Sequence, residues 1–400
     1  MSKVFPEKSI SAVTKVITSP VDKKTMPDEI PVFLCNYTDV YYNSKITGNM
    51  SFMEATAKQS EIDRFSLCPN DVVITKDSES ADDIGIPTYI QSIRENLLCG
   101  YHLTILRPKK NVDGRFLSLT LTHPRISYDF YRYANGITRF GLTNETYSKV
   151  KIPLPPVPEQ KSIAELLSTW DEAIEKTERL IQAKERQKIG ELHSRISSQK
   201  ANSTIGSFAK PVVRKVDKPD ESYVAVGIRS HFKGTFQRLV EDPRTVNMDS
   251  LYRVKENDLI VNITFAWEGA IALVKKEDEE CYVSHRFPTY EIKRSKAEPC
   301  FIRQLIMSSR MKYDLSNISP GGAGRNRVLN KKDFLKMPIW LPDLETQKNI
   351  GEYLGAIDNE IDLLKQLAEK YKTQKRGLMQ KMLTGEWRVK PEIVNQYMEA

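Results

Sequence analysis

The sequence predicts a chain of the α/β (α+β) class, with two pseudo-symmetric globular domains separated by two long antiparallel helices that form a coiled coil. Three observations support this prediction: a Pro-led helical segment occurs twice, both copies carry an apolar heptad pattern, and strand and turn signals precede each copy. The copies lie 187 positions apart and are identical at Ile152/Ile339, Leu154/Leu341, Pro155/Pro342, Gln160/Gln347, Lys161/Lys348, Ile163/Ile350, Glu165/Glu352, Leu167/Leu354, Asp171/Asp358, Ile174/Ile361, Leu180/Leu367, Gln187/Gln374, Lys188/Lys375 and Gly190/Gly377.

The repeat extends into the globular regions. Asn70-Asp71-Val72-Val73 matches Asn257-Asp258-Leu259-Ile260, and near the start of each half an offset of 195 matches Ile10 with Ile205. Matched positions are mostly apolar or turn-forming, whereas most Arg and Lys differ between the halves. A duplicated scaffold with two different surfaces predicts a partner or substrate that is read in two halves.

The domain boundaries follow from the repeat. We expect globular domains over 1–151 and 201–338, long helices over 152–200 and 339–390, and a C-terminal tail over 391–400. Each globular region mixes short apolar runs with Gly and Pro turns, which predicts strands. The expected strands include Val32–Leu34, Asp71–Thr75, Tyr101–Leu106 and Leu117–Leu119 in the first region, and Tyr223–Val226, Leu259–Asn262 and Ala270–Val274 in the second.

The second long helix has the clearer heptad pattern. Asp343 is a candidate N-cap and Gly385 a candidate stop, which gives a helix of about 40 residues, or about 60 Å. Only Lys375 interrupts the apolar series. The seam consists of Ile350, Leu354, Ile357, Ile361, Leu364, Ala368, Tyr371, Leu378 and Met382.

The first long helix begins in the same register with Ile163, Leu167, Trp170, Ile174, Thr177 and Ile181. Its seam then becomes charged, and the apolar series resumes out of phase at Ile189, Leu192 and Ile196, which predicts a stutter and a looser far end. Each helix needs a partner to bury its apolar face. Matched lengths favour pairing within one chain; the alternative is a coiled coil between two chains.

Composition narrows the function classes. The 400-residue chain has a net charge of +8 and a pI near 9.0, which favours an acidic partner such as nucleic acid. We expect no membrane span and no signal peptide, because no apolar run is long enough for the first and none follows the N-terminus for the second. The 5 cysteines are scattered, so we expect them to be reduced in a cytoplasmic protein. The sequence lacks a phosphate-binding loop, a nucleophile elbow and His or Cys spacing for a metal, so we expect no catalytic and no metal site.

One Gly-containing loop precedes each Pro-led helix: residues 135–141 and residues 319–327. A Gly-rich backbone approaches phosphate closely, while Arg and Asn reach base edges, so the loops are candidate DNA contacts. The alternative is a flexible surface loop with solvated arginines. The candidate DNA-binding residues are Arg139, Asn135, Arg115, Lys109, Arg325, Asn326, Arg327 and Arg286.

The sequence resembles the specificity subunit of type I restriction–modification systems. The resemblance covers essentially the whole chain and is carried by Pro155-Pro156-Val157-Pro158-Glu159-Gln160-Lys161-Ser162-Ile163-Ala164 and by Lys375-Arg376-Gly377-Leu378-Met379-Gln380-Lys381-Met382-Leu383-Thr384-Gly385. The second copy has Thr346-Gln347 where the family often has Glu-Gln, a departure that we expect to affect capping.

The resemblance implies a non-catalytic subunit with two target recognition domains for the halves of a split, asymmetric DNA site. The paired helices would set the distance between the half-sites and dock two modification subunits. Those partners would bring S-adenosylmethionine and methylate adenine, and restriction (motor and nuclease) subunits would bring ATP and Mg²⁺, so this chain would bind no cofactor directly. The candidates for helix pairing and partner docking are Ile163, Leu167, Trp170, Ile174, Ile181, Ile350, Leu354, Ile357, Ile361 and Leu364.

Two other functions fit parts of the sequence. One is a coiled-coil scaffold that assembles a complex without any DNA sequence preference. The other is an enzyme fragment, which the missing catalytic motifs disfavour. The sequence alone specifies neither half-site nor the spacer between them.

Overall fold

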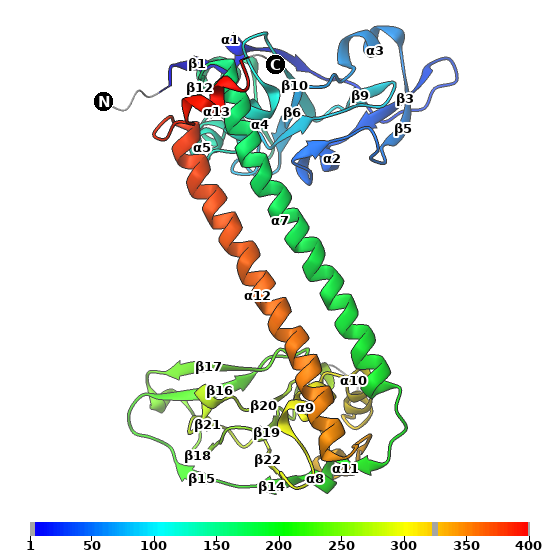
Figure 1. Ribbon diagram of the computed structural model, residues 1–400, viewed down its shortest axis with the longest axis vertical. Coiled ribbons are helices and arrows are strands. Elements are labelled where there is room, and N and C mark those ends of the chain that lie inside the picture. Colours follow the sequence, from blue (N-terminus) through cyan, green and yellow to red (C-terminus); the bar gives the residue numbers. More distant parts are fainter. Residues whose placement is uncertain (1–4, 322–326, 399–400) are drawn as a thin grey trace. The chain divides into compact units, whose positions relative to one another are not determined.

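The computed structural model describes residues 5–321 and 327–398, and the chain forms two compact units. The first unit comprises Met1–Lys176 and Ala368–Ala400, and the second comprises Thr177–Leu367. Each unit therefore contains one globular domain and a segment of each long helix. The mixed helix and strand content and the repeated domains confirm the predicted fold class (Figure 1).

The first domain is built on a five-stranded sheet in the order β2-β10-β6-β8-β4, antiparallel except for the pair β4 and β8. A three-stranded sheet, β5-β3-β9, packs beside it through shared buried residues such as Cys35 and Val73. The strands are β2(Thr14–Thr18), β3(Ile30–Cys35), β4(Lys45–Ile46), β5(Met53–Ala57), β6(Val72–Thr75), β8(Pro87–Ile90), β9(Leu97–Cys99) and β10(Leu103–Pro108).

Short elements complete this domain. β1(Glu7–Ser9) pairs with β12(Lys151–Pro153), and β7(Asp77–Ser78) pairs with β11(Phe140–Gly141). The helices are α1(Ile10–Val13), α2(Tyr37–Tyr41), α3(Gln59–Phe65), α4(Gly114–Leu121), α5(Pro124–Tyr133) and α6(Asn144–Lys149).

The strand predicted at Leu117–Leu119 is wrong, because these residues lie in α4. The Asp113 side chain accepts a hydrogen bond from the Phe116 backbone N–H and so caps the first turn. Phe116, Leu117 and Leu121 are buried, a spacing that belongs to one face of a helix. The alternating run was too short to distinguish the two periods.

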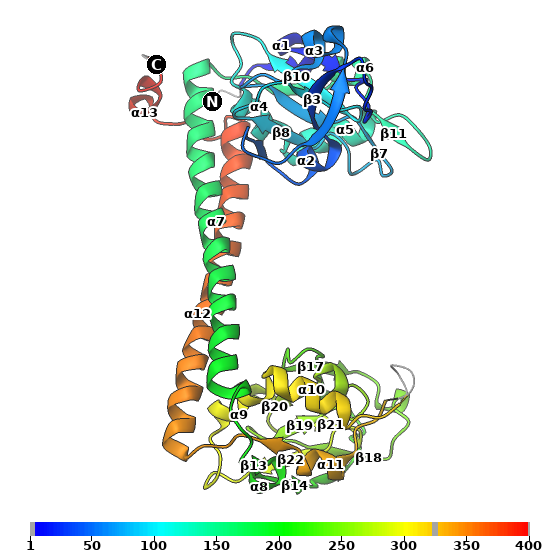
Figure 2. The ribbon, with the colours of Figure 1, turned by 90° about the vertical axis from the view of Figure 1, so that its right-hand side faces the viewer.

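The second domain has a four-stranded sheet, β14-β22-β19-β20, and a five-stranded sheet, β15-β18-β21-β16-β17. In Figure 2, α9 and α10 lie beside the four-stranded sheet, with which they share the largest apolar core. The strands are β14(Ala209–Val212), β15(Lys215–Asp217), β16(Tyr223–Ile228), β17(Thr235–Val240), β18(Ser250–Arg253), β19(Leu259–Val261), β20(Ile271–Leu273), β21(Tyr282–Val283) and β22(Thr289–Ile292).

One strand pair and four short helices of the second domain repeat those of the first. β13(Ser203–Thr204) pairs with β23(Pro338–Ile339), as β1 pairs with β12. The helices are α8(Ile205–Phe208), α9(Pro299–Ile306), α10(Ser309–Asn317) and α11(Lys331–Lys336), with 3₁₀ turns at Pro243–Thr245, Ala266–Glu268 and Lys276–Asp278. A short helix, α13(Pro391–Asn395), lies near the C-terminus.

The long helices are α7(Val157–Leu192) and α12(Leu344–Leu383), and they pair within each unit. In the first unit Ile163 and Leu167 share a buried cluster with Met382 and Leu383. The Trp170 and Tyr371 rings there have their centroids 5.7 Å apart. Residue numbers that rise along α7 thus meet numbers that fall along α12, so the pairing is antiparallel.

Charged pairs continue the seam where apolar residues stop. In the first unit Lys375 bonds Asp171, and in the second Lys188 bonds Asp358. These four residues are the repeat of one pair, because each aspartate and each lysine matches its counterpart at an offset of 187. The interruption of the seam by Lys375 is therefore filled by a salt bridge. In the second unit Lys184 also pairs with Glu360.

The ends of the helices agree in part with expectation. Asp343 accepts the Thr346 backbone N–H at 2.9 Å and its hydroxyl at 2.7 Å, and Gly385 follows α12 with φ of 80°, which confirms the predicted cap and stop. The predicted return of Ile189 to the seam is wrong, since it is 69% exposed. Leu192 and Ile196 are buried, and a π-helical turn at His193–Ser197 provides the local change of phase.

No helix within residues 5–321 and 327–398 combines the length and apolar character needed to cross a membrane.

Candidate nucleic-acid interface

The two loops singled out in the sequence occupy equivalent places on the scaffold. Each follows a helix, α5 or α10, and precedes another, α6 or α11. In the first domain the Gly141 N–H donates to the Asn135 carbonyl at 2.8 Å, and in the second the Val328 N–H donates to the Pro320 carbonyl at 3.4 Å. The backbone N–H of the next residue, Leu142 or Leu329, donates at 2.8 Å to a carbonyl just after the central strand. The acceptor is Lys76 after β6 in the first domain and Ile263 after β19 in the second.

The first loop presents its side chains to solvent. Asn135 and Arg139 are exposed, and Ile137 is 93% exposed. Gly136 has φ of 142°, and a Cβ there would lie 1.9 Å from the Arg139 carbonyl oxygen. The tight hairpin thus requires glycine at 136 and brings two of the predicted DNA-binding residues together.

The second loop is anchored by Arg327. Its guanidinium donates to the Ser319 carbonyl at 2.9 Å and to the Ser316 carbonyl at 2.7 Å, at the C-terminal end of α10. It also lies 5.0 Å from the centroid of the Trp267 ring. Arg327 therefore holds the base of the loop, and Arg325 and Asn326 lie outside the residues that the structure describes.

Different polar groups lie beside the two loops at one matched position. In the first domain Lys76 N–H donates to the His102 carbonyl at 3.0 Å, and the His102 ring lies 2.7 Å from the Asp77 carboxylate. In the second, Ile263 N–H donates to the Arg286 carbonyl at 3.1 Å. The Arg286 guanidinium is exposed and reaches the Thr264 hydroxyl at 3.4 Å.

The sequence prediction includes Arg286 and does not include Lys76, Asp77 and His102. The Lys76 ammonium lies 4.4 Å from the centroid of the exposed Tyr101 ring, which adds an aromatic surface to this edge. The available signal was the repeat itself, because Lys76 and Ile263 closely follow the matched segments that begin at Asn70 and Asn257.

Tyrosines extend the polar edge of the first domain. The Tyr37 and Tyr41 rings stack with centroids 5.6 Å apart, and the Tyr41 hydroxyl donates to Asp83 at 2.9 Å. That hydrogen bond to a carboxylate raises the pKa of Tyr41, while burial, followed by the Asp83 charge, raises the pKa of Tyr37. Tyr42 is 76% exposed beside them. Neutral hydroxyls and flat rings are suited to hydrogen bonding and stacking with nucleic acid.

Two other predicted DNA-binding residues lie elsewhere in the first unit. His102 immediately precedes β10 and Lys109 immediately follows it, so the two residues lie at opposite ends of this strand. The Lys109 ammonium donates to the Ala12 carbonyl at 2.8 Å. Arg115 lies on α4, and its guanidinium bonds the Glu165 carboxylate of α7 at 2.7 Å. The structure therefore does not bring Lys109 and Arg115 together with the 135–141 loop.

A buried ion pair supports the central strand in both domains. Asp71 is 1% exposed and accepts from the Arg107 guanidinium at 2.9 and 2.8 Å, which raises the pKa of Arg107. Asp258 is 3% exposed and bonds the guanidinium of Arg214. Each aspartate also accepts a backbone N–H from three residues earlier, so it fixes the turn that leads into the strand.

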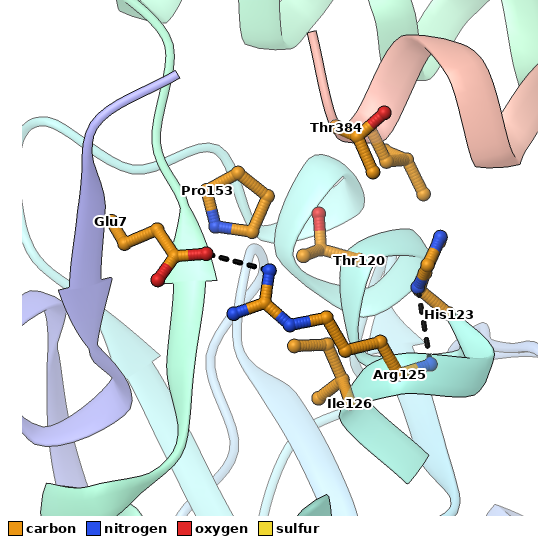
Figure 3. A pocket seen from close by; sticks show the side chains of 8 residues that line it. Glu7, Thr120, His123, Arg125, Ile126, Pro153 and Thr384 are labelled. Atoms are coloured by element: carbon orange, nitrogen blue, oxygen red, sulfur yellow. Dashed lines mark hydrogen bonds and ion pairs between the residues drawn. The ribbon is translucent and has the colours of Figure 1, made fainter. Parts of the chain in front are cut away.

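A small cavity in the first unit lies between α4, α5 and the end of α12 (Figure 3). The Arg125 guanidinium bonds Glu7 at 2.6 Å, and the His123 ring nitrogen accepts the Arg125 backbone N–H at 3.2 Å. Burial, followed by the Arg125 charge, lowers the pKa of His123. The cavity measures about 40 Å³, which is room for a few water molecules. Within residues 5–321 and 327–398, no cluster of three His, Cys, Asp or Glu could hold a metal ion.

Comparison with known proteins identifies relatives along most of the chain. The profile of the family described as "Type I restriction modification DNA specificity domain" matches residues 11–185 and 217–372, once in each half. A Methanocaldococcus jannaschii protein named "Putative type I restriction enzyme MjaX specificity subunit" is 28% identical over 357 residues, covering 83% of this chain and 82% of the relative. The "Type I restriction enzyme MjaVIII specificity subunit" of the same organism is 25% identical over 351 residues, covering 80% of each chain.

Solved structures share the fold. The "Type-I restriction-modification system S subunit from M. genitalium" superimposes with a TM-score of 0.57 at 14% identity, covering 96% of this chain and 97% of that one. A chain from a study of "complex assembly" and "conformational transition of the type I R-M system" gives a TM-score of 0.56 at 13% identity, covering 96% and 99%. At these identities the likeness concerns the fold alone.

Proposed function

Because this chain belongs to the family of type I restriction–modification DNA specificity subunits, we propose that it reads a bipartite, asymmetric DNA target, with one half-site for each globular domain. Specificity subunits of this family are generally non-catalytic, so the chemistry resides in other subunits of the complex. Mapping the methylated DNA motif identifies the sequences of the two half-sites and the length of the spacer between them.

One observation carries this proposal: the same scaffold position holds different hydrogen-bonding groups in the two domains. His102 with Asp77 stands beside the first loop, whereas Arg286 with Thr264 stands beside the second. An arginine favours guanine, which offers two acceptors in the major groove, whereas a histidine–carboxylate pair presents a different donor and acceptor pattern. Equivalent placement with unequal chemistry supports two half-sites of different sequence.

The helix pair is the proposed dock for the partners. We infer that two modification subunits and the restriction subunits assemble on it, and that they supply S-adenosylmethionine, ATP and Mg²⁺. The repeated salt bridges of Asp171 and Asp358 support two equivalent docking positions, because a repeated surface suits a partner present twice. We also infer that the assembly works in the cytoplasm, where its DNA target is accessible.

The test is to co-express this chain with the modification subunit from its own source and to map adenine methylation across a plasmid. Methylation at one split, asymmetric motif is the expected result, and it identifies both half-sites and the spacer. A stable complex that methylates no defined motif would instead support a coiled-coil scaffold without DNA specificity. A chain deleted of residues 135–141 serves as a control, because it should lose one half of the motif.

A further inference from the structure

An exposed tyrosine occurs at the same place in both domains. Helices α5 and α10 match at an offset of 185, so that Tyr128 corresponds to Tyr313. Tyr128 is 58% exposed and Tyr313 is 64% exposed. We propose that these two tyrosines form a matched pair of contacts to the DNA sugar–phosphate backbone, one in each half-site, which deepens and rests on the proposed function.

The core of the fold does not explain this identity. The buried positions of the two helices match only in class, with Ile126 opposite Met311 and Phe130 opposite Leu315. Folding selects apolar volume at these sites, and it requires no hydroxyl on the solvent side. A large aromatic side chain that is retained twice on the surface therefore points to a contact that both domains make.

Hydrogen bonding distinguishes the tyrosines from the matched arginines beside them. Arg125 is bonded to Glu7 at 2.6 Å and Arg310 to Asp314 at 2.8 Å, so both guanidinium groups already have carboxylate partners. Within the described part of the chain, neither the Tyr128 nor the Tyr313 hydroxyl has a hydrogen-bond partner. Those hydroxyls remain available to a ligand that accepts hydrogen bonds.

DNA is the ligand that the surroundings favour. Each helix leads directly into its candidate loop, because α5 ends two residues before Asn135 and α10 ends two residues before Ser319. A cation lies near the first ring, since the Arg132 guanidinium is 5.9 Å from the Tyr128 ring centroid, and the second helix carries exposed Lys312 next to Tyr313 in sequence. Tyrosine hydroxyls and nearby cations are typical phosphate contacts.

The duplex backbone also explains why the residue is the same in both domains. Base contacts must differ between two different half-sites, whereas phosphate contacts carry no sequence information and can be identical. The residues that differ, His102 and Arg286, belong to the first kind of contact, and the tyrosines belong to the second.

The experiment compares Tyr128→Phe, Tyr313→Phe and the double variant with wild type, each in complex with the modification subunit. The probe is a double-stranded oligonucleotide of random sequence, and a second duplex carries the mapped motif. We expect each single variant to bind both duplexes about tenfold more weakly and the double variant about 100-fold more weakly, as loss of one hydrogen bond to a charged phosphate at each site predicts. The salt dependence and the methylated motif should not change, because no charge is removed.

Tyr397→Phe, which removes a hydroxyl from the C-terminal segment, is the matched control and should bind like wild type. Unchanged DNA binding by the double variant would overturn the proposal. So would a loss confined to the cognate duplex, which indicates base reading, or a loss of the modification subunit during purification, which indicates a protein contact. If the wild-type complex methylates no motif, the proposed function fails, and the random-sequence duplex still decides whether the tyrosines contact DNA.

Discussion

The two globular domains share one half of their architecture and differ in the other. The strand order β2-β10-β6 in the main sheet of the first domain matches the order β14-β22-β19 in the four-stranded sheet of the second. Beyond them the first domain adds a three-stranded sheet, whereas the second adds a five-stranded sheet. The shared half carries both candidate loops and contacts the long helices. The duplication has thus kept the part that positions the candidate loops and changed the part beyond it.

The buried aspartates show how tightly the shared half is constrained. Asp71 and Asp258 occupy the same turn, yet Arg107 comes from β10 and Arg214 from the segment after β14. A buried carboxylate needs a cation and hydrogen bonds, and different parts of the sheet can supply the cation. The scaffold therefore specifies the charge at the turn and leaves the origin of its partner free.

The starts of the long helices differ in the matched residue itself. Glu159 is buried and bonded to Arg388, a contact that raises the pKa of Arg388 and joins the start of α7 to the segment after α12. The matched residue in α12 is Thr346, which bonds the Asp343 cap instead. The departure from Glu-Gln to Thr-Gln thus changes the capping, as expected. Only the first helix is tied down by a salt bridge of this kind among the described residues.

The largest effect is expected at the helix seam. Replacing Ile357 or Ile361 with Asp places a charge where each side chain is 5% exposed, which should destabilise the second unit by more than about 4 kcal/mol. Leu363→Asp is the matched control on the same helix, because Leu363 is 65% exposed. Thermal unfolding and co-purification with the modification subunit provide the measurements. An intact complex from Ile357→Asp would show that this seam does not hold the helices.

A second comparison concerns the buried ion pairs. Asp71→Ala and Asp258→Ala should each destabilise their own domain by about 2–3 kcal/mol, since each leaves an arginine without its carboxylate and both arginines are partly exposed. Urea unfolding with a fluorescence probe in each domain separates the two effects. If Arg107→Ala restores stability to Asp71→Ala, the unpaired arginine is the cause; equal losses in both domains from one substitution would contradict the division into units.

These comparisons also show which features the sequence could predict. The long helices, the Asp343 cap and the position of the loops follow from local periodicity and from the repeat. The strand expected at Leu117–Leu119 failed because a short apolar run fits either period, and the tertiary setting decided for helix α4. The pairing of His102 with Asp77 depends on strands that are distant in sequence, so no local pattern could reveal it.

The candidate DNA-binding residues beside the two loops provide the third test. Replacing Arg139 with Ala should weaken recognition of one half-site, and replacing Arg286 with Ala should weaken recognition of the other, by about 1–3 kcal/mol where the side chain contacts a base. Arg327→Ala is expected to act through the anchoring of its loop and not through a lost base contact, because Arg327 donates to the Ser316 and Ser319 carbonyls. Methylation of motif variants with one base changed measures each half-site separately. A uniform loss at both half-sites would contradict one domain for each half.

The smallest effect is expected at the start of α12, where acid should weaken the cap. The backbone N–H of Thr346, followed by its hydroxyl, lowers the pKa of Asp343 below its usual value near 4. A lowered pKa means that the charged cap stabilises fully above pH of about 4 and loses its contribution as pH falls through the folded value.

Asp343→Asn keeps an acceptor that does not titrate, so the difference in melting temperature between wild type and variant should shrink below pH of about 4. Asp362→Asn, in the interior of the same helix, is the control and should show no such change, because the free backbone N–H groups lie only in the first turn. A difference for Asp343→Asn that is constant from pH 7 to 2 would mean that the carboxylate charge does not contribute to the cap.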